Sequence, residues 1–128
     1  MRILLDTVAF LWAVTDAPEL SDDARELFVD PGNEVYLSSV SAWEICVKNA
    51  LGKLPLPDSP ARYVPVQRRQ HGIETLHLDE EAALRLNRLP VLHKDPFDRM
   101  LVCQALAQGL VILTPDKLIA QYPVRTAW

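Results

Sequence analysis

Glycine, cysteine and long apolar runs are all scarce in this sequence, and each shortage excludes a class of protein. The 128 residues include 4 glycines and no repeated or low-complexity segment, which excludes repeat and low-complexity architectures. No stretch approaches the roughly 20 apolar residues of a membrane span. The N-terminal run "MRILLDTVAFLWAV" is not a signal peptide, because Asp6 interrupts it and no small-residue cleavage site follows. We therefore expect a soluble, cytoplasmic protein without membrane contact.

The few cysteines and histidines are not spaced as metal ligands. Cys46 and Cys103 are far apart, form no C-x-x-C motif and lie in apolar helical patterns, so we expect both to be buried core thiols. His71, His77 and His93 show no pairing at ligand spacing either. We therefore expect no zinc site.

Length and charge indicate an ordinary globular chain with an uneven charge distribution. With 49% apolar and 23% charged residues, the chain is expected to form a single domain over residues 1–128. Residues 1–44 hold nine acids and two bases, whereas residues 45–128 hold eight acids and eleven bases. The net charge of −4 argues mildly against non-specific nucleic-acid binding. The basic excess of the later part nevertheless permits a polyanion to lie over it.

Short strand patterns alternate with helical patterns along the chain. Continuous apolar runs such as "RILLD" are typical of strands buried on both faces of a parallel sheet. We predict strands over residues 2–6, 34–38, 73–78, 111–114 and 124–128, and helices over 8–15, 22–30, 41–53, 61–72, 79–89, 95–108 and 115–122. This alternation predicts an α/β fold with a mainly parallel central sheet covered by helices on both faces.

Four acids follow the predicted strands in a way that brings them to one edge of the sheet. Asp6 ends the first strand, and Asp116 comes two residues after the strand at 111–114. Glu44 and Asp98 lie in the first turns of helices whose starts face the same edge. Because ligands of open α/β sheets gather beyond the carboxyl ends of the strands, we expect a site there.

Helix capping offers a simpler explanation for most of these acids. Ser41 and Glu44 match the S-x-x-E capping box. In "HKDPFD", Asp95 suits the N-cap position and Asp98 suits the positive end of the helix dipole. Asp116 can likewise begin its own helix. Taken one at a time, these acids need no metal.

The coincidence of four acids favours a metal site. A carboxylate at the end of an apolar strand, as at Asp6, is largely buried, and a buried charge is costly unless it is paired or metal-bound. Four carboxylates within about 4–6 Å would repel by a few kcal/mol even at an effective dielectric of 20. Oxygen ligands suit Mg²⁺ or Mn²⁺. Such a site supports the hydrolysis of phosphodiesters.

Four motifs together resemble a PIN domain, and specifically the VapC-type ribonuclease toxins of prokaryotic type II toxin–antitoxin pairs. The motifs are "LLDTVAFLWAV", "SSVSAWEICVKNALGKL", "HKDPFDRMLVCQA" and "LTPDKLIAQYPV". The resemblance runs nearly from end to end and is weakest across residues 55–75. One departure stands at Val8, where relatives often have histidine, and this removes any role for an imidazole there.

The resemblance assigns a role to each acid. It implies that the metal is held by Asp6, Glu44, Asp98 and Asp116, with one of the more peripheral carboxylates acting as general base. It places the hydroxyl of Thr114 near this acidic quartet, and leaves Thr7 and Asp95 as supporting residues beside it. The candidate RNA contacts at the same edge are Lys48, Lys94 and Arg99.

The resemblance also implies an activity and partners. It implies a Mg²⁺- or Mn²⁺-dependent RNA endonuclease that hydrolyses phosphodiester bonds in structured RNAs such as transfer RNA or ribosomal RNA. It further implies a homodimer, and a cognate antitoxin whose C-terminal segment covers the site.

Two other interpretations of the residues stay open. An aspartate-nucleophile phosphotransferase also ends its first strand in Asp, but it needs a second Asp where this chain has Val8. A non-catalytic binding module would use its acids only as helix caps and would act through apolar helices carrying Trp12, Trp43 or Trp128.

Overall fold

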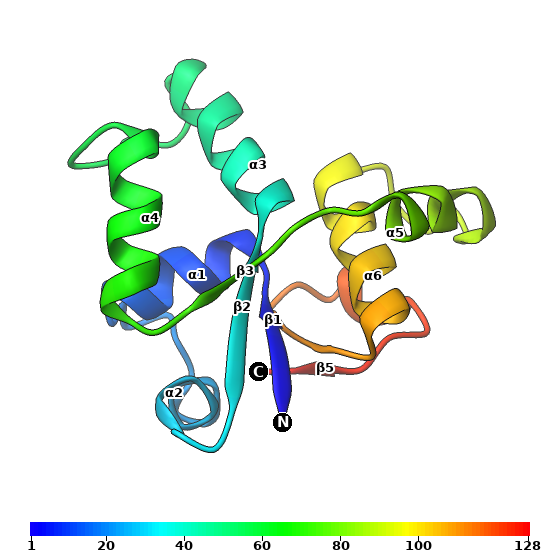
Figure 1. Ribbon diagram of the computed structural model, residues 1–128, viewed down its shortest axis with the longest axis horizontal. Coiled ribbons are helices and arrows are strands. Elements are labelled where there is room, and N and C mark those ends of the chain that lie inside the picture. The colour runs from blue at the N-terminus through cyan, green and yellow to red at the C-terminus, as the bar shows by residue number, and fades with distance from the viewer.

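The computed structural model describes all 128 residues and contains one sheet of five parallel strands (Figure 1). The strands pair in the order β3-β2-β1-β4-β5, so the first strand is central. Their bounds are β1 Arg2–Leu5, β2 Glu34–Ser38, β3 Glu74–Leu76, β4 Val111–Leu113 and β5 Thr126–Ala127. Every pairing is parallel. The predicted α/β fold is therefore confirmed.

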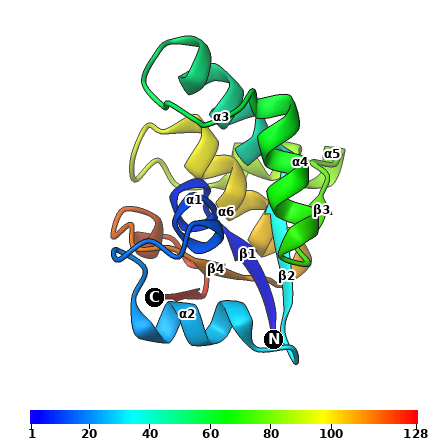
Figure 2. The ribbon, with the colours of Figure 1, turned by 90° about the vertical axis from the view of Figure 1, so that its left-hand side faces the viewer.

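Helices cover both faces of the sheet. Their bounds are α1 Thr7–Val14, α2 Asp22–Val29, α3 Ser39–Ala50, α4 Pro60–Gln70, α5 Glu80–Arg85 and α6 Pro96–Gln108, with short 3-10 turns η1 Leu86–Arg88 and η2 Ile119–Gln121. Figure 2 looks at the molecule from the side that carries α1, α2 and α4, with α5 and α6 behind the sheet. This arrangement leaves the strands buried on both sides.

Alternation along β1 divides the core into two layers. Ile3 and Leu5 point to one face, where they pack with Phe10 of α1 and other apolar residues of α1, α2 and α4. Leu4 points to the opposite face and packs with residues of α6 such as Leu101. Because successive side chains of a strand face opposite ways, a continuous apolar run is what a sheet covered on both faces requires.

Several predicted strands and helices are shorter in the structure than predicted, or divide in two. Predicted strand 73–78 shortens to Glu74–Leu76, and the predicted helix 79–89 divides into α5 and the turn η1. Predicted helix 115–122 forms only the 3-10 turn η2. Asp6 lies just outside β1 and caps α1.

The start of α3 also differs from the prediction. The helix begins at Ser39 with Ser38 as its N-cap, whose hydroxyl accepts a hydrogen bond from Val40 N–H at 3.0 Å. The predicted capping box at 41–44 is therefore absent. Its buried residues are Val40, Ser41, Glu44 and Ile45.

Apolar residues at helical spacing along α3 turn outward. Trp43 is 58% exposed and Leu51 63% exposed. Cys46 is exposed as well, which corrects its prediction as a core thiol, whereas Cys103 is buried as predicted. The physical reason is that polar partners at the sheet edge bury the other face of this helix.

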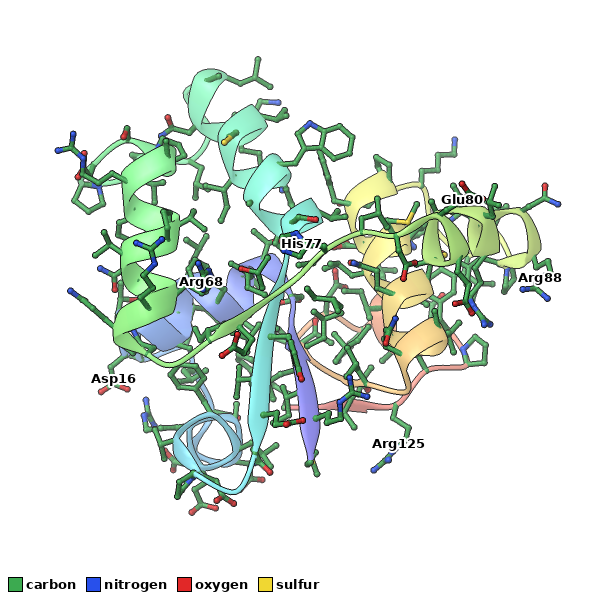
Figure 3. All side chains as sticks on the ribbon, viewed as in Figure 1. Asp16, Arg68, His77, Glu80, Arg88 and Arg125 are labelled. Atoms are coloured by element: carbon green, nitrogen blue, oxygen red, sulfur yellow. The ribbon has the colours of Figure 1, made fainter.

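Charged side chains extend away from the layered core. Asp16, Arg88 and Arg125 all extend outward from the ribbon (Figure 3) and are exposed. A membrane-crossing helix is not found, since none of the helices is both long and apolar enough.

The C-terminal cap of α6 yields a prediction about stability. Gly109 ends the helix in the left-handed conformation, with φ 68° and ψ 39°. Its N–H donates to the carbonyl of Ala105. A side chain strains this backbone, so Gly109→Ala is expected to lower the free energy of unfolding by about 1–2 kcal/mol. Urea denaturation measures the change, with Gln108→Ala as the control. Equal stability of the two variants would contradict the capping argument.

Candidate active site

A cleft of about 190 Å³ opens at the carboxyl edge of the sheet. The first turns of α3 and α6 lie at this end of the molecule (Figure 1). All four acids of the quartet line the cleft, together with four further residues; the eight are Asp6, Thr7, Val8, Glu44, Lys48, Asp95, Asp98 and Asp116. Segments far apart in the sequence thus contribute to one acidic surface.

Asp6 is held at the centre of the sheet edge by backbone and side-chain bonds. Its N–H donates to the carbonyl of Leu113 at 3.2 Å, which continues the pairing of β1 with β4. Its Oδ1 accepts from Ala9 N–H at 2.7 Å, and its Oδ2 accepts from the hydroxyl of Thr114. Burial raises the pKa of Asp6 to about 6, even though both hydrogen bonds lower it. The side chain is therefore a desolvated carboxylate in a fixed orientation.

Glu44 approaches the cleft from the first turns of α3 and is 4% exposed. Its Oε1 accepts from the hydroxyl of Thr7 at 2.6 Å, and Thr7 Oγ1 lies 3.0 Å from Ser41 Oγ. Its Oε2 forms an ion pair with Lys48, one turn along the same helix. The hydrogen bond to Glu44 raises the pKa of Lys48. The lysine thus supplies a positive charge inside an acidic cleft.

Asp95 and Asp98 occupy the start of α6 and have different surroundings. Asp95 is the N-cap, and its Oδ1 accepts from the N–H groups of Phe97 at 2.9 Å and Asp98 at 3.1 Å. Burial, together with repulsion from Asp95 and from the three other acids of the quartet, raises the pKa of Asp98 to about 8. Asp95 therefore has a capping role, while Asp98 is a carboxyl group that ionises at a free-energy cost.

Asp116 completes the quartet from the segment after β4. Its N–H donates to Thr114 Oγ1 at 3.0 Å, and its Oδ1 accepts from Leu118 N–H at 2.8 Å. Thr114 is buried and also donates to Asp6. One hydroxyl thus connects the positions of two acids of the quartet.

An aromatic contact joins the two helices that carry Glu44 and Asp98. Trp43 of α3 meets Phe97 of α6 edge to face, with ring centroids 4.9 Å apart and planes at 75°. Each ring belongs to the residue immediately before one of these acids. This geometry is favourable for aromatic pairs, and it sets the spacing of the helices on either side of the cleft.

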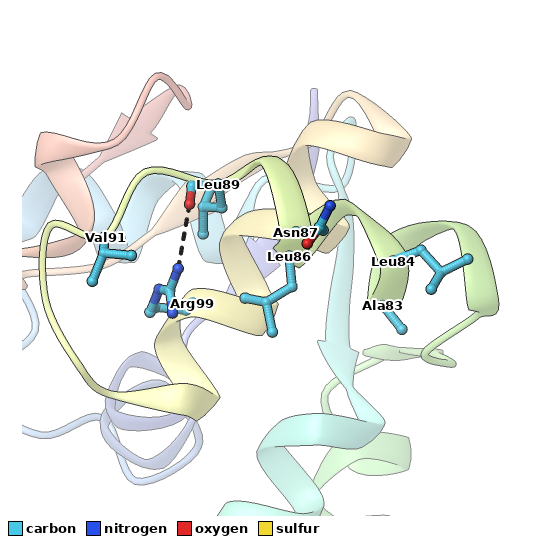
Figure 4. Close-up of a pocket in the computed structure, with 7 residues that line it drawn as sticks. All are labelled: Ala83, Leu84, Leu86, Asn87, Leu89, Val91 and Arg99. Carbon is cyan, nitrogen blue, oxygen red and sulfur yellow. Dashed lines mark hydrogen bonds between the residues drawn. The ribbon is translucent and has the colours of Figure 1, made fainter.

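The three candidate RNA contacts lie in different places. Lys48 lines the acidic cleft, whereas Lys94 is exposed and does not line it. Arg99 turns toward a larger cavity of about 500 Å³ formed by α5, η1 and the following segment (Figure 4). There its Nη2 donates to the carbonyl of Leu89 at 3.4 Å. Of the three, only Lys48 therefore faces the quartet directly.

Three contributors to this site are not predicted from the sequence. Ser41 is predicted only as a possible helix cap, but it is fully buried beside Thr7. His93 has Nε2 at 3.5 Å from Asp98 Oδ2, and Tyr122 contacts His93. The one sequence signal for His93 is its position in "HKDPFD", close before Asp98. For Tyr122 the sequence holds no local signal.

The donor set suits a hard divalent cation, although the side chains are not arranged around one. In the structure, no three Asp, Glu, His or Cys side chains lie close enough together to hold one metal ion. The quartet nevertheless lines one cleft, and burial raises the pKa of Asp6 and Asp98 there. Carboxylate oxygens are the ligands that hard divalent cations prefer, so the donor set of the quartet fits Mg²⁺ or Mn²⁺.

A five-stranded parallel α/β fold with an acidic cleft beyond the carboxyl ends of its strands describes a recognisable class of domain. The family model of the PIN domain matches residues 3–124. The chain belongs to the PIN-domain family.

Comparison with individual proteins places VapC-type proteins among the relatives, which confirms the predicted resemblance. Ribonuclease VapC16 of Mycobacterium tuberculosis is 42% identical over 66 residues, a match that covers 48% of this chain and 47% of that protein. The match thus spans about half the length of the curated relative.

Solved structures share the whole fold at low identity. VapBC2 from Rickettsia felis, bound to a DNA fragment from its promoter, aligns with a TM-score of 0.74 and 15% identity over 99% of this chain and 98% of that chain. DNA-bound VapBC from Salmonella typhimurium aligns with a TM-score of 0.69 and 21% identity over 99% and 97%. At these identities the likeness shows the fold.

The raised pKa of Asp98 predicts how stability depends on pH. Between about pH 4 and pH 8 the folded protein keeps a proton that the unfolded chain has released. The stability of the metal-free protein therefore falls as pH rises through this range, by up to roughly 1 kcal/mol per pH unit. Asp98→Asn mimics the protonated side chain and is expected to remove this part of the fall.

Chemical denaturation at several pH values tests this expectation. Glu19→Gln changes an exposed acid away from the cleft and serves as the matched control. The stability gain of Asp98→Asn over wild type should grow from pH 4 to pH 8. A gain that is the same at every pH would exclude repulsion and burial as its cause.

Proposed function

We propose that this protein is a metal-dependent endoribonuclease that acts as the toxin of a toxin–antitoxin pair, and that residues 1–128 form its single domain. The observation that carries the proposal is the convergence of four carboxylates from four separate segments on one cleft. Membership of the PIN-domain family and the likeness to ribonuclease VapC16 support the same activity.

The acids of the cleft and the hydroxyl groups beside them have separate roles in this proposal. Asp6, Glu44, Asp98 and Asp116 would hold the cation. Mg²⁺ or Mn²⁺ would supply Lewis-acid chemistry at the phosphodiester and ease the deprotonation of water. Hydroxyl groups of the chain orient the acids, since Thr114 donates to Asp6 and Thr7 donates to Glu44.

Hydrolysis needs a proton acceptor as well as a metal. The oxygen of water attacks phosphorus, the bond from phosphorus to one ribose oxygen breaks, and that oxygen leaves with a proton. A carboxylate of the cleft accepts the proton from the attacking water as general base. Burial favours this role, because a carboxyl group with a raised pKa is a stronger base than an exposed one.

A cognate antitoxin and a second copy of the chain are the protein partners in this proposal. The solved structures with the same fold include VapBC assemblies. Trp43, Val47 and Leu51 follow one another at four-residue spacing along α3, and the first and last of these are mostly exposed. Apolar surface of this kind is typical of an interaction site.

The residues of the cleft also argue against the two alternative functions that the sequence leaves open. Val8 lines the cleft at the position where an aspartate-nucleophile phosphotransferase needs its second acid. A binding module that uses its acids only as caps leaves Glu44 unexplained, because Glu44 is buried and does not cap α3. Neither alternative accounts for all four acids.

Metal-dependent cleavage of RNA tests the proposal. Wild type is expected to cut a mixture of transfer and ribosomal RNAs with Mn²⁺ and to be inactive with excess chelator. Asp6→Asn is expected to lower the rate at least about 100-fold, because it weakens a central cation ligand. The metal alone should raise the thermal midpoint of wild type, as a ligand of the folded state does.

Glu19→Gln serves as the control and should retain wild-type cleavage, because this acid is exposed and remote from the cleft. A wild-type protein whose midpoint does not respond to Mn²⁺, and which leaves RNA intact, would contradict the proposal. A contaminating nuclease would cut equally in the Asp6→Asn preparation.

The orientation of the basic residues predicts unequal effects on RNA binding. Lys48 pairs with Glu44, and a cation held by Glu44 would free the ammonium group of Lys48 to contact phosphate. Lys48→Ala is therefore expected to lower the slope of log affinity against log salt by about one, whereas Arg99→Ala leaves the slope unchanged. Binding is measured with Ca²⁺ in place of Mn²⁺ to prevent cleavage. Equal slopes for wild type and Lys48→Ala would show that Lys48 does not contact the RNA phosphates.

A further inference from the structure

The ring of His93 lies between a buried tyrosine and the cleft. The His93 side chain is 8% exposed. On one side its Nδ1 is 2.8 Å from the hydroxyl of Tyr122, a residue that follows η2 and is buried. On the other side its Nε2 is 3.5 Å from Oδ2 of Asp98 on α6. A single imidazole therefore connects the acidic quartet to a distant part of the chain.

The hydrogen bonds of Tyr122 favour one tautomer of His93. The backbone N–H of His93 donates to the Tyr122 hydroxyl at 3.3 Å, so this oxygen already accepts one bond. Its own proton is then free to point to the remaining neighbour, Nδ1 of the ring. A nitrogen that accepts carries no proton in neutral imidazole, so this arrangement favours the tautomer with the proton on Nε2. In that tautomer the N–H faces Asp98.

Nε2 of His93 is a buried polar atom that lacks a hydrogen-bond partner. Leaving such an atom unsatisfied destabilises the folded protein. Oδ2 of Asp98, at 3.5 Å, is the acceptor that faces it. The geometry therefore directs one oxygen of Asp98 toward the histidine.

Asp98 needs this support more than the other acids do. Asp6 and Glu44 each accept two side-chain or backbone bonds, and Asp116 accepts one from a backbone N–H. The carboxylate of Asp98 accepts none of the hydrogen bonds found in the structure, and His93 is the basic side chain that contacts it. The imidazole is therefore the group best placed to orient this acid.

We propose that His93, locked by Tyr122, is a positioning residue that holds Asp98 in the orientation needed to bind the cation. The inference rests on the proposed metal site. It assigns the histidine to the support of a ligand rather than to the metal or the RNA. Partners of this kind orient metal ligands, and their loss typically weakens metal affinity about 10- to 100-fold.

Direct measurement of Mn²⁺ affinity tests the proposal without any RNA. Isothermal titration at pH 8 compares wild type with His93→Leu and His93→Gln. His93→Leu removes the donor and should weaken Mn²⁺ binding about 10- to 100-fold. His93→Gln keeps an N–H donor near the position of Nε2 and should recover most of the affinity. His77→Leu is the control, because His77 is exposed just beyond the carboxyl end of β3 (Figure 3).

Nitrogen-15 NMR of the imidazole rings gives a second readout, the tautomer of His93. If His93 only filled space, Tyr122→Phe would not couple its tautomer to Mn²⁺ affinity. Wild-type His93 should show the Nε2–H tautomer, and Tyr122→Phe should give a mixture of tautomers with a smaller loss of Mn²⁺ affinity. This conservative variant also covers the case in which His93→Leu fails to fold.

The outcomes separate the two proposals. If wild type binds no Mn²⁺, the proposed metal-dependent function fails and this inference fails with it. If wild type binds Mn²⁺ but His93→Leu and Tyr122→Phe bind it within twofold of wild type, the positioning role alone is overturned. Weak binding by His93→Leu, restored by His93→Gln, is the result expected.

Discussion

Repulsion between carboxylates gathered at one edge of the sheet is the constraint on which the surrounding structure depends. Burial and neighbouring charge raise the pKa of Asp6 to about 6 and that of Asp98 to about 8, so ionising both costs stability. The hydrogen-bonded ladder of β1 and β4 nevertheless fixes the first of these acids beside Thr114. Packing on both faces of the sheet supplies the opposing free energy, as expected where a functional site is held against local stability.

Helix capping and the proposed metal binding are compatible roles rather than rival explanations. One oxygen of Asp6 caps α1 through Ala9 N–H, while the other bonds Thr114 at the cleft. In "DPFD" two neighbouring acids divide these roles. Asp95 caps α6, and Asp98 is left free to face the other three acids of the quartet. A capping signature in a sequence therefore does not argue against a site at the same residue.

Local patterns predicted the parts of the fold that depend on neighbours in the sequence. Buried strands read as apolar runs, and parallel strands necessarily bring the residues after their carboxyl ends, such as Asp6 and Asp116, to one edge. Periodicity within a helix, by contrast, shows which side is apolar but not which side meets the sheet. For α3 the buried side carries Ser41 and Glu44, so Cys46 faces outward. Contacts such as Tyr122 with His93 join distant segments and leave no trace in either pattern.

The edge-to-face contact of Trp43 with Phe97 makes Trp43 an intrinsic fluorescence probe of the cleft. The indole is partly exposed, and its contact spans the two helices that carry Glu44 and Asp98. Indole emission depends on the polarity and proximity of its surroundings, so its wavelength reports the separation of α3 and α6. Trp12 and Trp128 form a separate pair elsewhere, and replacing both leaves Trp43 as the single indole. Opening or closing of the cleft then becomes visible in real time, without any label attached to the protein.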